Sequence, residues 1–209
     1  MPITFGEEIT TRAELRSYVK EPSHRVSRKA IDHIDRLCAR FIAASPFAIV
    51  ATRGVDGQLD LSPKGDPAGF VAVLDEHTLA IPDRLGNNRV DSFENLLAHP
   101  EVGLIFLILG AGDTLRVSGT GRIVRDLALR ERLTIDGRAP NLVLVVDVKE
   151  AFLHCQKCIV RSHLWQPEHW PDISDVPTLA EAMVAHGRLD ESVPEMQAII
   201  DNDRNMRLY

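Results

Sequence analysis

The sequence has little of what holds small secreted folds together: only three of its 209 residues are cysteine. An odd, small number of cysteines excludes a disulfide-stapled scaffold and favours reduced thiols in the cytoplasm. No apolar run approaches the roughly 20 residues of a membrane-spanning helix, and the start, MPITFGEEIT, lacks the basic and apolar parts of a secretory signal. The formal net charge of −6 argues against a broad nucleic-acid surface, which needs clustered lysine and arginine. We therefore expect a cytoplasmic protein that binds neither nucleic acid nor membrane.

What the sequence does contain is the composition of an ordinary globular domain, with 44% hydrophobic and 26% charged residues. A chain of this length can bury a sizeable core without disulfides or a structural metal. The residue pattern divides the chain into a helical segment over residues 1–45, a strand-rich domain over 46–150, and a helical and irregular appendage over 151–209.

The central part shows the short apolar runs and turn signals of antiparallel β structure. Asp56-Gly57 and Asp75–His77 are typical of hairpin turns, and Ala128–Leu133 of a helical turn. Because the helices lie outside the strand block, the pattern favours a closed antiparallel barrel of six or seven strands in an α+β chain. The expected strands are Phe47–Thr52, Gln58–Ser62, Phe70–Leu74, Thr78–Ile81, Val102–Leu109, Thr114–Val124 and Leu142–Val148.

Capping residues and apolar spacing predict where the helices lie. A helix through Ala98 is expected to begin at Asn87 or Asn88, with Val90, Phe93, Leu96 and Leu97 on its buried side. Ile31, Ile34, Leu37, Cys38, Phe41 and Ile42 recur at helical spacing, so a helix there should lay one face on the core. The other expected helix starts are Thr11 with Glu14, Ser23, Thr178 with Glu181, and Ser192 with Glu195.

Two polar segments, Leu61–Asp66 and Asp83–Arg89, lie where barrel strands should end. A phosphate monoester carries nearly two negative charges, so its site needs cations, hydroxyl or amide donors, and free backbone N–H groups at a helix start. The two segments hold these groups and indicate an anion site, with a solvent-facing loop beside a capped helix as the alternative. The candidates are the cations Lys64 and Arg89 and the donors Ser62, Asn87 and Asn88.

Beyond these local signals, the chain resembles a known family. The stretches GNNRVDSFENLLAHPEVGLIFLI and DTLRVSGTGRIV resemble the pyridoxamine 5′-phosphate oxidase-like, FMN-binding split-barrel family. The similarity extends to AIVATRGVDGQLDLSPKGDPAGFVAVLD, and together it covers about residues 40–150. No single motif is specific to the family, but the order and spacing of the motifs are.

The resemblance implies a six-stranded antiparallel split β-barrel with flanking helices, in which residues 46–150 bind FMN. It also implies a homodimer with FMN at the subunit interface, because a split barrel leaves a cleft that only a second subunit closes. The chain is most similar to a branch described as FMN-binding proteins related to the oxidase, through SPKGD, GNNR, LRVSG and HCQKC with RSHLW. The tail with which the oxidases read pyridoxal phosphate is not recognisable, so pyridoxamine phosphate is not implied as the substrate.

The resemblance also implies roles for individual residues. Reduction of a flavin places negative charge along its N1–C2=O edge, and a nearby cation stabilises that charge. Lys64 and Arg116 are the candidates for this role. Thr114 or Ser118 could donate hydrogen bonds to the pyrimidine edge, with exposed strand positions as the alternative. No catalytic side chain is assigned, and the full expected FMN-binding set is Ser62, Lys64, Asp83, Asn87, Asn88, Arg89, Thr114, Arg116, Ser118, Arg161 and Trp165.

The sequence departs from the pattern of the oxidases at the helix start. The oxidases have Ser-Arg-Lys there, whereas this chain has Asn87-Asn88-Arg89 and therefore one cation fewer. Lys64 can compensate for it.

The segment Cys155–Cys158, with His154 and His163 nearby, allows two other interpretations. A structural zinc usually needs four protein ligands, often as two pairs. A redox dithiol usually lies at the turn from a strand into a helix in a parallel βαβ unit. The chain has one cysteine pair and no such unit. A structural role near the flavin or the subunit interface, without a metal, is therefore favoured.

From the resemblance we expect an FMN-dependent oxidoreductase, whose flavin is reduced by a hydride donor or an oxidisable small molecule. Two alternatives stay open. The same residues would serve a flavin-binding or flavin-storing module without turnover. A haem-handling split-barrel protein would need an axial histidine, for which His77 in a hairpin turn is the candidate.

Overall fold

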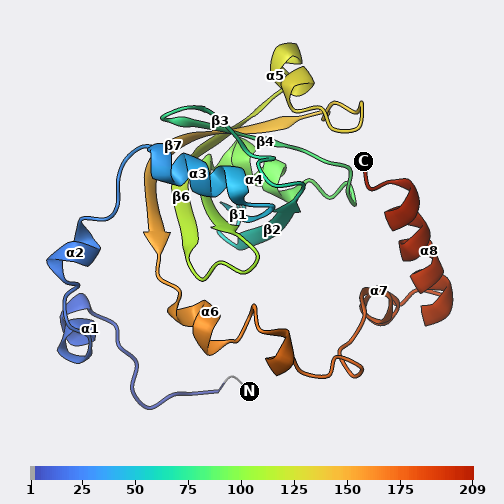
Figure 1. The fold of residues 1–209 in the computed structure, drawn as a ribbon. Coiled ribbons are helices and arrows are strands. Elements are labelled where there is room, and N and C mark those ends of the chain that lie inside the picture. The colour runs from blue at the N-terminus through green and yellow to red at the C-terminus, as the bar shows by residue number, and fades with distance from the viewer. Residues whose placement is uncertain (1–2) are drawn as a thin grey trace.

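A seven-stranded antiparallel sheet, curled around one core, forms the centre of the molecule (Figure 1). The computed structural model describes residues 3–209. The strand order is β2-β1-β5-β6-β7-β4-β3, and β2 and β3 form its two edges. All the strands expected from the sequence are present, one more than the six that the family resemblance implies. They are β1 (Phe47–Arg53), β2 (Leu59–Gly65), β3 (Ala72–Asp75), β4 (Thr78–Pro82), β5 (Glu101–Leu107), β6 (Thr114–Val124) and β7 (Val143–His154).

Some helices pack on the sheet and others extend from it. α3 and α4 lie against the barrel, whereas α1 and α2 lie away from it on one side and α7 and α8 on the other (Figure 1). Within residues 3–209, no helix has the length and apolar character needed to cross a membrane. The helices are α1 (Arg12–Tyr18), α2 (His24–Ser27), α3 (Arg36–Ala44), α4 (Asp91–Ala98), α5 (Leu127–Arg132), α6 (Lys157–Arg161), the 3₁₀ helix η1 (Pro167–His169), α7 (Leu179–Gly187) and α8 (Val193–Met206).

Alternate residues of the strands line the interior of the barrel, as the period of two in a β-strand requires. In β1, Ala48 and Val50 are fully buried, while the residues between and beside them are only half-buried. Phe106 of β5 belongs to the same core cluster as Ile42 of α3 and Leu96 of α4. The two helices therefore complete a core that the curled sheet alone leaves open.

β7 is longer than the sequence pattern predicted. Expected to end at Val148, it continues to His154. Its first residues are buried on both faces, because one face lies in the barrel core and the other packs with Leu133 beside α5. The pairing of β7 with β6 shifts between Ser118 and Gly119. The extra residue of this bulge is Lys149 of β7, which with Glu150 interrupts the apolar pattern, so that this part of the strand resembles a loop in the sequence.

The first core-facing helix begins later than its apolar spacing predicted. α3 starts at Arg36, where the Asp35 carboxylate accepts a hydrogen bond of 2.8 Å from the Cys38 N–H. Ile31 lies outside the helix and forms an isolated β-bridge with Ala151. Leu37, predicted to face the core, is 56% exposed. The apolar residues before position 36 are therefore core residues of an extended segment and not of a helix.

The other expected helix starts outside the centre of the chain are confirmed, with one difference. Thr11 accepts a hydrogen bond of 3.2 Å from the Glu14 N–H, and complete capping boxes begin at Thr178 and Ser192. Ser23 occupies the N-cap of α2, but its side chain makes no capping hydrogen bond.

Gly119 of β6 lies directly beside this bulge. A Cβ atom at this position would overlap the backbone carbonyl oxygen of Asp147. Because that atom is backbone in a paired strand, it cannot move aside without breaking the ladder. This is a physical reason for the glycine that ends the LRVSG motif, Leu115–Gly119.

Replacing Gly119 with alanine should therefore lower the free energy of unfolding by about 3 kcal/mol, since the new methyl group overpacks the β6–β7 contact. Gly103→Ala on β5 is the matched control, because its Cβ would make an ordinary contact 3.7 Å from the Ala51 side chain. Urea unfolding followed by circular dichroism measures both variants. Equal midpoints for the two would contradict this account of the bulge.

Candidate functional site

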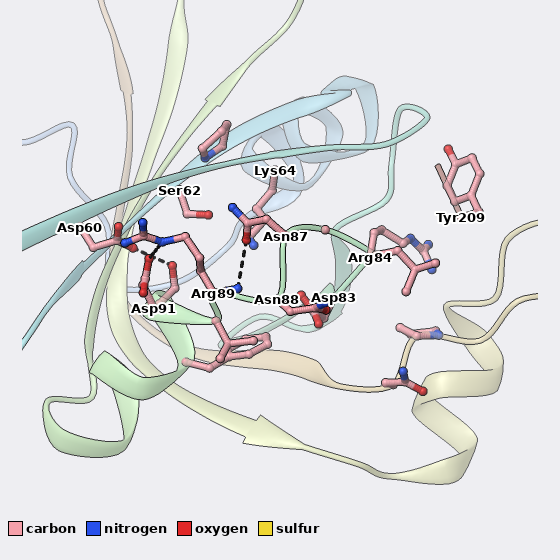
Figure 2. A pocket seen from close by; sticks show the side chains of 18 of the residues that line it. Asp60, Ser62, Lys64, Asp83, Arg84, Asn87, Asn88, Arg89, Asp91 and Tyr209 are labelled. Carbon is pink, nitrogen blue, oxygen red and sulfur yellow. Dashed lines mark hydrogen bonds and ion pairs between the residues drawn. The ribbon is translucent and has the colours of Figure 1, made fainter. Parts of the chain in front are cut away.

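β2 places a row of polar side chains along one wall of a pocket (Figure 2). Its alternation puts Asp60, Ser62 and Lys64 on one partly buried face, while the residues between them point the other way and are exposed. The pocket has a volume of about 520 Å³, within the range of small-molecule sites. Its second wall is the loop Asp83–Val90, which joins β4 to α4.

This loop has an unusual backbone. Asn88 has a φ of 60° and Val90 a φ of 51°, both in the left-handed region, which is unfavourable for a β-branched residue such as valine. The Asn87 Oδ1 accepts a hydrogen bond of 3.0 Å from the Arg89 N–H. The helix therefore begins at Asp91 with Val90 as its N-cap residue, and the prediction that Asn87 or Asn88 caps it was wrong. Backbone strain of this kind is concentrated at ligand-binding sites.

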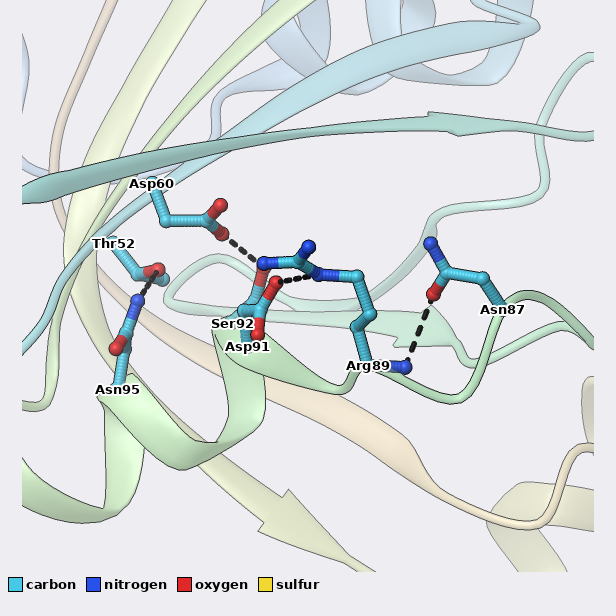
Figure 3. A network of polar contacts seen from close by, with 7 residues as sticks. All are labelled: Thr52, Asp60, Asn87, Arg89, Asp91, Ser92 and Asn95. Atoms are coloured by element: carbon cyan, nitrogen blue, oxygen red, sulfur yellow. Dashed lines mark hydrogen bonds and ion pairs between the residues drawn. The ribbon is translucent and has the colours of Figure 1, made fainter. Parts of the chain in front are cut away.

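Two side-chain hydrogen bonds fasten α4 to the strands beneath it (Figure 3). The Ser92 hydroxyl donates to Asp60 Oδ2 of β2 at 2.8 Å, and the Asn95 amide donates to Thr52 Oγ1 of β1 at 3.1 Å. These bonds hold the start of α4, and with it the loop, above β2. Leu97, predicted to be buried on this helix, points away and is 80% exposed, and Val90 is 44% exposed.

The cations at the pocket differ in how they are engaged. The Arg89 Nε donates to Asp91 Oδ2 at 2.7 Å, and the Arg84 Nε donates to Asp66 Oδ2 at 2.6 Å. Lys64 forms no ion pair or side-chain hydrogen bond with any other residue of the described range, 3–209. Its ammonium group is therefore available to a ligand, whereas both arginines already have carboxylate partners.

The far end of the pocket is built by residues that sequence reasoning missed. Residues 138–141 and Tyr209 line it together with Arg84. Tyr209 reaches it by a hydrogen bond to Asp66, 143 positions earlier in the chain, and no local sequence pattern signals such a contact. Asp60, by contrast, lies on the same face as Ser62 and Lys64, and strand alternation would have found it.

The pocket brings together one part of the predicted FMN-binding set. These residues come from two elements that are separate in sequence, the strand β2 and the β4–α4 loop. They are Ser62, Lys64, Asp83, Asn87, Asn88 and Arg89.

The rest of the predicted set does not line this pocket. Thr114 is buried at the start of β6, and Ser118 is exposed farther along it. The Arg116 guanidinium lies over an aromatic ring of β7, 5.1 Å from its centroid. Arg161 is exposed on α6, and the Trp165 indole donates a hydrogen bond of 2.7 Å to the backbone of the β5–β6 loop. Their role toward a flavin stays a prediction.

The cysteines are separated by environment. Cys155 and Cys158 are exposed free thiols, whereas Cys38 is buried in the core, where desolvation raises its thiol pKa to about 11. Within residues 3–209 there is no group of three or more side chains placed to hold a metal ion. The structural role of the exposed pair stays a prediction.

A comparison with the profiles of known protein families identifies the family of this chain. A profile described as pyridoxamine 5′-phosphate oxidase matches residues 34–155, more than half of the sequence. The chain belongs to the pyridoxamine 5′-phosphate oxidase family. This confirms the resemblance seen in the sequence and the α+β split-barrel fold, with seven strands instead of six. No curated protein sequence matches the chain.

Several solved structures are similar to more than half of this family member. HupZ of Group A Streptococcus is 20% identical, with 59% of this chain and 95% of that chain covered and a TM-score of 0.47. A putative pyridoxamine 5′-phosphate oxidase of Lactobacillus delbrueckii is 19% identical, with 58% and 99% covered and a TM-score of 0.46. An FMN-binding protein of Syntrophomonas wolfei is 11% identical, with 57% and 83% covered and a TM-score of 0.43.

Asp83 offers a test of the pocket's electrostatics. Burial raises the pKa of its carboxyl group above 3.8, and the nearby Lys64 charge only partly opposes this. A raised carboxyl pKa means that ionisation costs more in the folded than in the unfolded chain. The resulting loss of stability is absent below the unfolded pKa and develops as the pH rises through the folded pKa.

Asp83→Asn should therefore raise the free energy of unfolding at pH 7 by up to about 1 kcal/mol, and the gain should shrink toward pH 4. Asp75→Asn is the matched control with the opposite sign. The His77 N–H donates to the Asp75 carboxylate at 2.8 Å and lowers its pKa, so the wild-type chain keeps that stability above pH 3.8 and loses it as the pH falls. Urea unfolding at pH 7 and at pH 4 measures the change in unfolding free energy of each variant relative to wild type. A destabilised Asp83→Asn variant at pH 7 would show that the carboxylate is needed in its charged form.

Proposed function

We propose that this protein binds FMN in the pocket between β2 and the β4–α4 loop and acts as an FMN-dependent oxidoreductase. The observation that carries the proposal is the unengaged Lys64 ammonium, facing a loop of amide side chains across a pocket large enough for the ligand. Cations, amide donors and free N–H groups are the partners that a phosphate monoester needs. Membership of the pyridoxamine 5′-phosphate oxidase family supports the same ligand class.

Charge distribution favours one orientation of the ligand. Asp60 and Asp91 lie at one end of the pocket, where Arg89 balances only one of them. The other end holds three cations, Lys64, Arg84 and Arg138, against two carboxylates, Asp66, which is paired with Arg84, and Asp83, which lies near Lys64. A dianionic phosphate is therefore better placed toward Lys64, and the uncharged flavin ring toward the acidic end.

Bound FMN would supply the hydride-transfer chemistry that no side chain of the pocket can perform. Lys64 holds the phosphate, and Ser62 and the amides of Asn87 and Asn88 donate hydrogen bonds to the ligand. The bonds that fasten α4 keep these donors in place without the ligand.

Two subunits complete the site in this proposal. The outer face of the sheet carries half-buried apolar residues on adjacent strands, among them Ile49 of β1 and Ile105 of β5, which are paired in register. Apolar side chains gathered on one sheet face are typical of a subunit interface. Arg116 of β6 pairs with Ile105 and lies on the same face, so a partner subunit seated there would receive it. This arrangement would bring the remaining predicted FMN residues to the partner's pocket.

The haem alternative finds no support in the pocket. No histidine lines it within the described range of the chain. His77, the candidate axial ligand, contacts the His33 ring at 6.2 Å between centroids, away from the pocket. A flavin-storing module would use the same pocket, and the rate of FMN reduction by NADH or NADPH separates storage from turnover.

The ligand assignment predicts that Lys64→Ala weakens FMN binding roughly ten- to a hundredfold, because one charge-assisted contact to phosphate is worth about 1.5–3 kcal/mol. Arg89→Ala should weaken it less, since Asp91 already engages that side chain. Lys149→Ala on β7, outside the pocket, is the control. Titrations monitored by flavin fluorescence measure the affinities. Riboflavin, which lacks the phosphate, should bind the Lys64 variant as it binds the wild type, and an equal loss for both ligands would place Lys64 at the ring.

The subunit arrangement predicts that Ile105→Glu disrupts the dimer, since a charge in an apolar interface has no partner there. The dissociation constant of the dimer should rise at least about hundredfold, and FMN binding should weaken with it. Leu127→Glu, at a position 64% exposed on α5, is the control. Sedimentation velocity with and without FMN gives the result. A wild-type chain that stays monomeric at micromolar concentration with FMN bound would contradict the arrangement.

A further inference from the structure

The segment that follows α8 lies at the candidate FMN pocket, although the helices before it lie away from the barrel. Residues 179–209, which comprise α7, α8 and the segment up to Tyr209, are called the arm. α7 and α8 lie away from the barrel, yet the end of the arm lies beside the barrel again (Figure 1). The Tyr209 hydroxyl donates a hydrogen bond of 2.7 Å to Asp66 Oδ1, and the Arg138 guanidinium donates to the Tyr209 backbone oxygen. Both Tyr209 and Arg138 line the pocket. The arm is thus fixed at the pocket by two contacts of one residue.

Asp66 is the centre of this attachment. Its side chain is 1% exposed, and its second oxygen accepts the hydrogen bond from Arg84. A carboxylate this deeply buried is stable only when donors satisfy both oxygens. Tyr209 supplies one of the two donors, so the position of its ring is set by the barrel and not by the arm alone. The ring stands at the end of the pocket opposite Asp60 and Asp91, beyond Lys64 (Figure 2).

We infer that Tyr209, held by Asp66, closes the pocket beyond the phosphate position and restricts the ligand to a flavin monophosphate. This rests on the proposed function and on the ligand orientation that the pocket charges favour. A flavin dinucleotide carries a second nucleotide on its phosphate, and with the phosphate at Lys64 that nucleotide has to continue past Arg84. The Tyr209 ring occupies this path. Tyr209 is therefore a specificity-determining residue, and Asp66 is the residue that positions it.

The test compares FMN and FAD affinities by flavin fluorescence in the full chain. Wild type should prefer FMN, and Tyr209→Ala should lower the ratio of FMN to FAD affinity at least tenfold, about 1.4 kcal/mol, because FAD affinity rises. Tyr209→Phe keeps the ring but loses the bond to Asp66, so its preference should lie between the two. Tyr18→Ala, at the chain's other tyrosine, 71% exposed on α1, is the control.

A measurement without ligand checks the attachment itself. The chain has only two tyrosines, so in a Tyr18→Phe background the Tyr209 phenol can be titrated by absorbance or NMR. The hydrogen bond to the Asp66 carboxylate raises the pKa of this phenol. Asp66→Asn should lower that pKa toward its ordinary value and should shift ligand preference toward FAD, as Tyr209→Ala does.

The outcomes separate the two proposals. A wild-type chain that binds neither FMN nor FAD overturns the proposed function. A chain that binds FMN, with an FMN-to-FAD preference unchanged by Tyr209→Ala, overturns only the inference about Tyr209. A Tyr209 phenol that titrates at an ordinary pKa in wild type, unaffected by Asp66→Asn, overturns it as well.

Discussion

The Thr52 hydroxyl is buried in the barrel, at 2% exposure, and a polar group buried in this way must find a hydrogen-bond partner. Its partner is the Asn95 amide of α4. A second bond joins Ser92 of α4 to Asp60, and the apolar residues Phe93 and Leu96 of the same helix enter the core. The helix can neither slide nor rotate without leaving Thr52 unsatisfied. The loop that precedes it, and so one wall of the pocket, is held relative to β2 by the same requirement.

The sequence predicted the fold well where local periodicity decides the structure. Every strand was placed, because turn residues such as Asp56-Gly57 and alternating apolar positions are local signals. The errors occur where a non-local contact prevails. β7 continues past Val148 because a bulge at Lys149 lets it stay paired with β6, and Ile31 is extended because it bridges to Ala151. The residues next to β7 or to Ile31 in the sequence do not reveal these pairing partners.

In the site, too, the features set by local sequence signals could be predicted and those set by distant contacts could not. Ser62 and Lys64 could be predicted to share a wall because every second residue of a strand points to the same face. The β4–α4 loop was found by its residue types, but its helix start was misplaced because Asn88 and Val90 adopt left-handed conformations that no sequence rule assigns to valine. Tyr209 could not be found, since its contact with the pocket joins distant parts of the chain.

The arm and the pocket are coupled through that contact. α7 and α8 bury Ala180 and Met196 between them, but a pair of short helices has too little core to hold its own position. The end of the arm therefore depends on the hydrogen bonds of Tyr209 to reach the barrel. A ligand that displaced the Tyr209 ring would therefore break the contact that holds the end of the arm, and a partner that drew the arm away would open the end of the pocket. The free energy of these few contacts limits how strongly the two events are linked, because coupling cannot exceed the difference in interaction between the two states.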